Sequence, residues 1–317
     1  MNAKQKKKLR LLLAVLAVAA ALFLVLRHHN TASDAADETA VDTSAAAAGI
    51  TALSYNNGTV TLRFAREGGS WYWAEDRAFP LDSARVNEIA GLAGSLTPLS
   101  PIAPDQADAL SAYGLESPMR YVSVTASDGT ETTVYLGNQS ADGTYYMTKS
   151  GDDGTVYVIA SDLADKTAAG INDMAILPLL PTVMETAVKQ VHITAPGLDR
   201  TVTVSGGVWT EGAADVSARQ EITDFKALLG SLGVTACVDY RPSADAYGLC
   251  GLGETAAKVT LTYTGSTGGE AQLSLTVGNA RDTGGGYYAL VNKESTIYLM
   301  SADQASVLLA MAGSWAG

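Results

Sequence analysis

The chain has 317 residues, 47% of them hydrophobic, and a formal net charge of −12. That length suits two domains, each large enough to bury a core. The acidic balance argues against a nucleic-acid partner, because no basic stripe is present to neutralise phosphates. It also argues against a chain that lies flat on anionic lipid.

Basic charge gathers at the N-terminus. The first thirty residues contain no acid and hold Lys4, Lys6, Lys7, Lys8, Arg10 and Arg27. Residues 11–26 form an apolar run close to the lower length limit for a membrane span. By the positive-inside rule, residues 1–10 are a cytoplasmic tail and the bulk of the chain is extracytoplasmic. We therefore expect a single-pass protein of the cell membrane, held by a signal anchor. A cleaved signal peptide is the alternative that the sequence leaves open.

Residues 27–49 are expected to be a flexible tether. They are rich in Ala, Asp, Thr and Ser and have almost no large apolar side chains. Such a segment buries too little surface to offset the entropy of ordering it. As a random coil it would span about 25 Å, which keeps the folded part near the membrane.

A first α+β unit is predicted at residues 50–170. Alternating strands flank Asn57-Gly58, a dipeptide that favours a tight hairpin turn. Asp82 or Ser83 can cap a helix whose apolar residues share one face. Gly114 suits the position after a helical turn. Strand-like runs separated by Asp-Gly steps then predict an antiparallel meander, closed by a helix that begins at Ser161.

Residues 171–187 form a joint rather than a free linker. Leu177-Pro178-Leu179-Leu180-Pro181 is apolar enough to pack against a neighbour, and its prolines prevent a continuous helix. A second α+β unit is predicted at 188–316, with Trp209 as the counterpart of Trp71 and Ser301 capping a final helix. Whether the two units share one sheet is left open.

Short motifs recur in the two units. Ala112-Tyr113-Gly114-Leu115 returns as Ala246-Tyr247-Gly248-Leu249, and Tyr145-Tyr146 returns as Tyr287-Tyr288. Matching features keep the same order along the chain, which indicates two homologous units in tandem, each a β-hairpin, a helix and an antiparallel meander.

Both cysteines, Cys237 and Cys250, fall in the second unit. Outside the cell a disulfide between them is permitted and would stabilise the fold by about 3 kcal/mol. Two unbonded thiols are the alternative, because the first unit has no cysteine at either equivalent place. A metal site is not expected from two cysteines at this spacing.

No catalytic constellation stands out. His192 is the only histidine of the folded region, and it lies on an ordinary alternating strand. Carboxylates are abundant, but no pair is singled out for hydrolysis. The glycines suit turns and not a phosphate-binding loop. We therefore predict no catalytic residues, no cofactor and no metal.

Aromatic residues are the remaining candidates for binding. Adjacent aromatics on a strand point to opposite faces, so one of each pair can pack inward and the other can meet a partner. The candidate interaction surface is therefore Tyr145, Tyr146, Tyr287 and Tyr288.

The chain resembles the bacterial family of domain of unknown function 4340 (DUF4340). The resemblance rests on Trp71-Tyr72-Trp73, Phe79-Pro80-Leu81-Asp82, Ala112-Tyr113-Gly114-Leu115, Gly143-Thr144-Tyr145-Tyr146 and Leu177-Pro178, together with the basic, anchored N-terminus. Members of this uncharacterised family often occur beside ABC-type transporter components. The resemblance thus implies an accessory role in the bacterial cell envelope and carries over no functional residues.

From these features we expect a non-enzymatic, membrane-anchored interaction module with a protein partner in the membrane or envelope. A module that binds cell-envelope glycan through exposed Trp or Tyr side chains is the alternative. An envelope hydrolase would need two carboxylates that face one cleft.

Overall fold

The computed structural model describes residues 49–102, 109–152 and 154–313. The basic tail, the apolar segment at 11–26 and the tether up to residue 48 lie outside these ranges. Among the helices that are described, none has the length and apolar character needed to cross a membrane.

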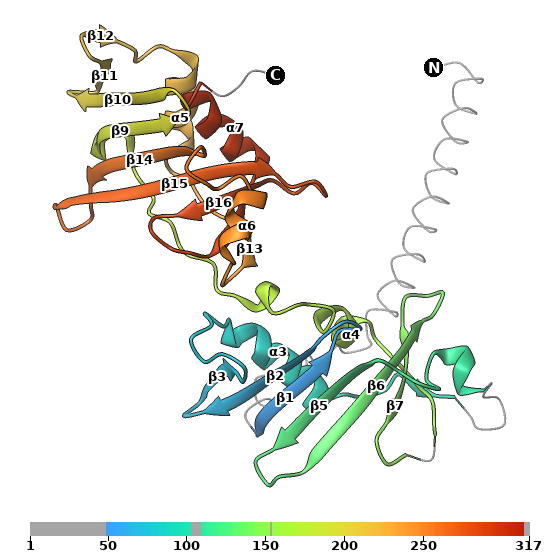
Figure 1. Cartoon of the computed structure of the whole chain (residues 1–317). Helices are drawn as coiled ribbons and strands as arrows, with labels where there is room; N and C mark the ends of the chain where they lie inside the picture. The colour runs from blue at the N-terminus through green and yellow to red at the C-terminus, as the bar shows by residue number, and fades with distance from the viewer. Residues whose placement is uncertain (1–48, 103–108, 153, 314–317) are drawn as a thin grey trace, which may run out of the picture.

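The fold is mixed α and β, built on two separate antiparallel sheets (Figure 1). The joint at 171–187 runs between them. We call the part before the joint the first half and the part after it the second half. The two halves do not share one sheet, because among the described residues no strand of one half pairs with a strand of the other.

The first half contains an eight-stranded sheet in the order β3-β2-β1-β5-β6-β7-β8-β4. Its strands are β1 (Ile50–Asn56), β2 (Thr61–Glu67), β3 (Ser70–Trp73), β4 (Ser100–Pro101), β5 (Arg120–Ala126), β6 (Glu131–Gln139), β7 (Tyr145–Lys149) and β8 (Tyr157–Ile159). Its helices are α3 (Ser83–Gly94), the 3-10 turn η1 (Leu110–Tyr113) and α4 (Asp162–Lys166).

The second half contains a nine-stranded sheet in the order β12-β11-β10-β9-β14-β15-β16-β17-β13. Its strands are β9 (Val188–Ala195), β10 (Leu198–Ser205), β11 (Val208–Glu211), β12 (Ala214–Asp215), β13 (Ala236–Asp239), β14 (Ala257–Thr264), β15 (Glu270–Ala280), β16 (Tyr287–Val291) and β17 (Ile297–Met300). Its helices are α5 (Gln220–Leu228), α6 (Ala244–Leu249) and α7 (Ala302–Met311).

Local signals in the sequence explain many of these boundaries. The Asn57-Gly58 turn joins β1 to β2, with Gly58 at φ +99°. The Asp82 carboxylate accepts the backbone N–H of Ala84 and so starts α3. Ser301 caps α7 in the same way by accepting from Gln304. Ser161 precedes α4 but makes no such side-chain bond.

Apolar residues of both halves form one continuous buried cluster that includes Met174 and Val183 of the joint. In β1 the alternation places Leu53 and Tyr55 inside, and in α3 the inward face carries Val86 and Ile89. Each large side chain buried in this way contributes about 1.5–3 kcal/mol. The joint is therefore part of the core.

Backbone hydrogen bonds attach the joint to both halves. Asp82 donates its N–H to the carbonyl of Met174, and Ile176 donates to Pro80, at 2.8 and 2.7 Å. Further along, Val183 donates to Leu229 at 3.3 Å. These bonds lie at the two ends of the joint, so a short segment spans from one half to the other.

One sequence match is in the wrong register. Gly114, at φ +71°, packs against the Asn138 side chain, and the residue that does the same in the second half is Gly251, at φ +67°, against Asn279. Gly248 instead lies within helix α6. The counterpart of Ala112-Tyr113-Gly114-Leu115 is therefore Leu249-Cys250-Gly251-Leu252, and Cys250 stands where the first half has Tyr113.

Candidate functional site

The four tyrosines predicted as an interaction surface are all half-buried. Tyr146 packs edge-to-face on Tyr113, with ring centroids 4.8 Å apart, in a small separate cluster. Tyr145 and Tyr287 pack against the main core. Neighbouring rings of the first pair thus enter different clusters, as their alternation on β7 requires.

The two cysteines are free thiols in this structure. Cys237 is buried on β13 and lies 3.9 Å from Oδ1 of Asn172. Burial, with the nearby carboxylates of Asp239 and Asp173, raises its pKa to about 11. Cys250 is half-buried at the end of α6, where burial also raises its pKa.

His192 faces a single polar partner. Its Nε2 lies 2.8 Å from Oδ1 of Asp199 across the β9–β10 hairpin, and both side chains are exposed. The described residues also contain no group of three or more His, Cys, Asp or Glu placed to hold a metal ion.

The aromatic run on β3 leads to a more developed site. Trp71 points into the core and donates its indole N–H to Oδ1 of Asn87 at 2.6 Å. Tyr72 points outward and donates to Glu67. Trp73 lies at the end of the strand, and its indole N–H is buried without a hydrogen-bond partner among the described residues.

Trp73 lines a pocket of about 380 Å³ at the junction of the two halves, which we call the junction pocket. The first half contributes Trp73, Asp76 and Phe79, and the joint contributes Ile171 and Asn172. The end of β13 and the loop after it supply the remainder of the lining, Asp239, Tyr240 and Arg241. The site exists only where three segments far apart in sequence meet.

Three aromatic rings line this pocket. Trp73 meets Phe79 edge-to-face with centroids 5.5 Å apart, and Phe79 meets Tyr240 in the same manner at 5.1 Å. The Tyr240 hydroxyl donates to the carbonyl of Ala78 at 2.7 Å, which fixes the ring against the first half. Phe79 is buried, and these two contacts hold the rings of Trp73 and Tyr240 in place.

Charged groups line the same pocket. Arg241 Nη1 lies 2.7 Å from Oδ2 of Asp76, and the Arg241 guanidinium carbon lies 5.1 Å from the centre of the Tyr240 ring. Asp239 accepts the backbone N–H of Arg241. The Asn172 amide donates to the carbonyl of Val238 and so ties the joint to β13. The lining thus holds two carboxylates and one cation.

A second hollow of about 570 Å³ is also lined by Tyr240. It is lined by Ile176 and Pro178 of the joint and by the 293–296 turn of the second half. The joint also exposes large apolar side chains to solvent. The exposed fractions of Ile176, Met184 and Leu179 are 56%, 69% and 100%. Of these three exposed side chains, Ile176 lines the second hollow.

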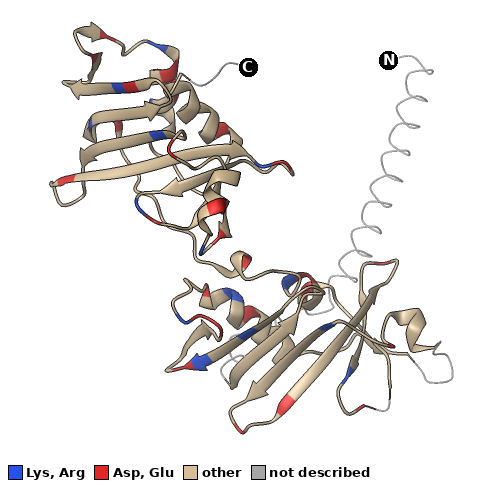
Figure 2. Cartoon of the chain, viewed as in Figure 1, with Lys and Arg blue, Asp and Glu red and all other residues tan. Residues whose placement is uncertain are grey.

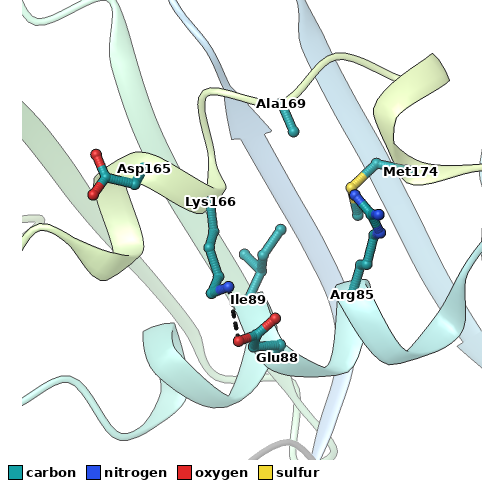
Figure 3. Close-up of a pocket in the computed structure, with 7 residues that line it drawn as sticks. All are labelled: Arg85, Glu88, Ile89, Asp165, Lys166, Ala169 and Met174. Carbon is teal, nitrogen blue, oxygen red and sulfur yellow. Dashed lines mark ion pairs between the residues drawn. The ribbon is translucent and has the colours of Figure 1, made fainter. Parts of the chain in front are cut away.

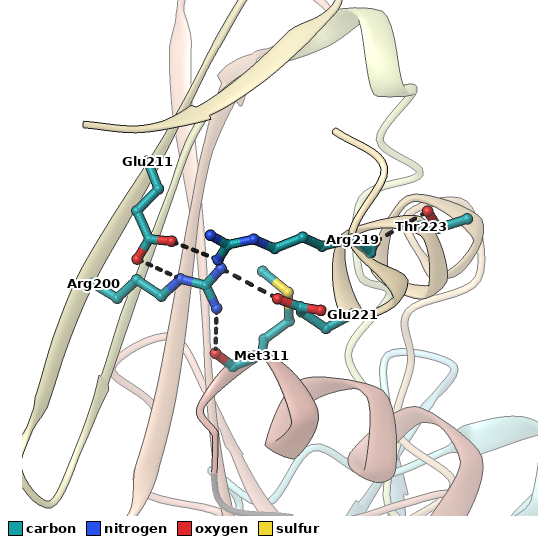
Figure 4. A network of polar contacts seen from close by, with 6 residues as sticks. All are labelled: Arg200, Glu211, Arg219, Glu221, Thr223 and Met311. Carbon is teal, nitrogen blue, oxygen red and sulfur yellow. Dashed lines mark hydrogen bonds and ion pairs between the residues drawn. The ribbon is translucent and has the colours of Figure 1, made fainter. Parts of the chain in front are cut away.

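Two other polar clusters are structural in character. Figure 3 shows a hollow beside α3 and α4 in which Lys166 pairs with Glu88. The two charged atoms are 2.8 Å apart, and Arg85, which also lines the hollow, donates to the carbonyl of Asp173. Figure 4 shows Arg200, whose side chain is only 11% exposed, between Glu211 and Glu221. Arg200 also donates to the carbonyl of Met311 and so holds the end of α7.

A family model described as a domain of unknown function (DUF4340) matches residues 71–251, more than half of the chain. The chain belongs to this family. The DUF4340 match begins at Trp71 and ends at Gly251, so it includes every residue that lines the junction pocket. A search of curated proteins and a search of solved structures each gave no match.

Sequence patterns had marked only part of this site. Trp73 and Phe79 belong to motifs that carried the family resemblance, and the joint was expected to pack. Tyr240 and Arg241 gave no signal, because they lie in a loop without periodicity and become significant only through contacts with residues far away in the chain.

Proposed function

We propose that this DUF4340 protein is a non-enzymatic interaction module, anchored in the cell membrane and exposed on its extracytoplasmic side, that works as an accessory of a membrane complex such as an ABC-type transporter. In this proposal residues 11–26 are the anchor and residues 27–49 the tether. The two halves are tandem homologous units at 50–170 and 188–316, and their common strand order supports a shared origin.

The observation that carries the proposal is the exposed apolar surface of the joint. Soluble proteins bury most large apolar side chains, and a group left exposed beside a pocket commonly marks an interface. Ile176, Leu179 and Met184 form such a group within nine positions of sequence. Charge elsewhere is mixed: Figure 2 shows acidic and basic residues interspersed over both halves.

Crosslinking in the native membrane tests this proposal. The tagged full-length protein would be crosslinked, purified and analysed for co-purifying proteins. We expect an ABC permease in stoichiometric amount, lost in the variants Leu179→Asp and Met184→Asp. Met119→Asp is the matched control, because Met119 is 68% exposed but lies far from the joint in sequence, just before β5. Recovery that is insensitive to both joint variants would refute the joint as the interface.

Binding of cell-envelope glycan is the second candidate. The aromatic rings and hydrogen-bonding groups of the junction pocket are the features that favour it, because sugars stack on aromatic faces and bond to carboxylates and amides. Retention on purified envelope glycan that is lost in Trp73→Ala, with the fold intact by circular dichroism, would support this candidate over the first.

A further inference from the structure

We propose that the junction pocket is a receptor for a cationic side chain, a guanidinium or ammonium group presented by the partner protein. The inference rests on the proposed function in taking the partner to be a protein. It adds the chemistry by which that partner is recognised.

The first argument is the composition of the pocket. Aromatic faces attract cations through the ring quadrupole, and a nearby carboxylate adds a direct charge interaction. The junction pocket offers the half-buried rings of Trp73 and Tyr240, both packed on the buried ring of Phe79, together with the carboxylates of Asp76 and Asp239. With Arg241 included, the formal charge of the lining is negative.

The second argument is that the pocket already holds a cation of the chain itself. Arg241 makes both of the contacts that a ligand would make, a charged bond to Asp76 and an approach to the face of Tyr240. Yet 64% of its side chain is exposed to solvent. A guanidinium held by one ion pair at the surface is weakly fixed, because such pairs contribute at most about 1 kcal/mol. A ligand cation can therefore replace it.

The third argument is the position of the pocket. The joint supplies Ile171 and Asn172 to the pocket lining, and the same short segment carries the exposed apolar side chains, so a partner that covers the joint can place a basic side chain in the pocket. An apolar contact area with a charged anchor beside it is a common arrangement of binding hot spots. The acidic charge of the whole chain, −12, would further attract a basic partner segment.

The test compares two small probes that differ only in charge. N-acetyl-arginine amide and N-acetyl-citrulline amide have nearly the same shape, but citrulline is neutral. Binding to the full-length protein in detergent would be followed by calorimetry and by tryptophan fluorescence. We expect the arginine probe to bind at least tenfold tighter than the citrulline probe. Choline, a free small cation, distinguishes general cation binding from recognition of a side chain on a peptide.

Variants separate the roles of the residues. Arg241→Ala removes the resident competitor and should tighten binding of the arginine probe about tenfold. Asp76→Asn and Tyr240→Leu should weaken it about tenfold, whereas Tyr240→Phe keeps the ring face and should retain binding. Arg77→Ala is the matched control, because Arg77 also lies over a tyrosine, Tyr72, and pairs with a carboxylate, Glu67, but lines none of the hollows described above.

Equal binding of both probes, or no binding to the wild type and to Arg241→Ala, would overturn the inference. Tight binding of neutral sugars in place of the arginine probe would overturn it as well. Choline bound as tightly as the arginine probe would refute recognition of a partner side chain. If Asp76→Asn has lost the probe but the permease still co-purifies with it, this inference fails while the proposed function stands.

Discussion

Gly251 is the structural counterpart of Gly114. Both adopt a left-handed backbone conformation, and both place their Cα against the side chain of an asparagine, Asn138 in the first half and Asn279 in the second. Each asparagine in turn donates its side-chain N–H to a carbonyl just before the glycine, that of Ala112 or Leu249. The same small device thus links η1 to β6 and α6 to β15.

This relationship predicts opposite effects for two neighbouring glycines. In Gly251→Ala the new Cβ would lie 2.5 Å from Cγ of Asn279, on a backbone at φ +67°. We expect the variant to lose about 3 kcal/mol of unfolding free energy. Gly248→Ala adds a methyl group to helix α6 with no atom within 4 Å, and should change stability by less than about 1 kcal/mol, in the stabilising direction. Urea denaturation would compare the two, and a larger loss in Gly248→Ala would contradict the structural register.

The Arg200 network gives a second prediction. Arg200→Met removes the partner of Glu221 and one of the two arginine partners of Glu211, which keeps Arg219, and it frees the last carbonyl of α7, at Met311 (Figure 4). Because these groups are largely shielded from water, we expect a loss of about 2–3 kcal/mol.

Arg63→Met provides the comparison for Arg200→Met. Arg63 pairs with Glu75 at 3.2 Å, but its side chain is well exposed. Its loss should therefore cost less than about 1 kcal/mol. Thermal unfolding of the two variants under the same salt conditions measures the difference, and equal effects would mean that burial does not set the strength of these pairs.

Local patterns predicted much of the fold. The Asn57-Gly58 turn, the Asp82 cap and the alternation in β1 each depend on residues close together in sequence, and all three are present. The sequence comparison matched residues 112–115 with 246–249 because these two strings are identical. The structural match, 249–252, is less similar in sequence. Only the contact with Asn279 shows that Gly251, and not Gly248, needs the left-handed conformation.

The junction pocket could not be predicted for a related reason. Tyr240 owes its place to a hydrogen bond with Ala78 and a ring contact with Phe79, both made across the two halves. No periodicity within the 239–241 loop encodes such contacts. A sequence can mark Trp73 and Phe79 as unusual, but their meeting with Tyr240 depends on how the joint packs.

The two buried tryptophans predict a matched pair of effects. Trp71 donates its indole N–H to Asn87 within the first half, whereas Trp209 donates to Glu185 of the joint at 3.3 Å. Asn87→Leu and Glu185→Leu each leave a buried N–H without a partner, which costs about 1–3 kcal/mol. Glu185 also pairs with Lys226 at 3.1 Å, so its loss should loosen the joint as well.

Limited proteolysis distinguishes these two variants. We expect Glu185→Leu, and not Asn87→Leu, to increase cleavage in the joint at 171–187. Denaturant titration of both variants would show the common loss of stability. Cleavage of the joint that rises equally in both would contradict a specific tie between Glu185 and the second half.

The thiols give a prediction that depends on pH. The pKa of Cys237 is raised to about 11 by burial and nearby carboxylates, so at pH 8 its thiol is protonated and a poor nucleophile. Cys250 is only half-buried. Iodoacetamide at pH 8 should therefore modify Cys250 well before Cys237, and denaturant should make the two rates equal. Peptide mass spectrometry reads both sites. Failure of either thiol to react until a reductant is added would show instead that the two are joined as a disulfide.

The raised pKa of Cys237 also determines the direction in which the unfolding free energy changes with pH. The folded state holds the Cys237 proton more tightly than the unfolded state, so the protonated thiol contributes to the unfolding free energy. That contribution is complete below the unfolded pKa, near 9. It is lost as the pH rises toward 11. The variant Cys237→Ala should lose less stability than the wild type between about pH 9 and 11, the window between those two pKa values. Equal slopes of unfolding free energy against pH in the two proteins would show that Cys237 does not titrate differently on folding.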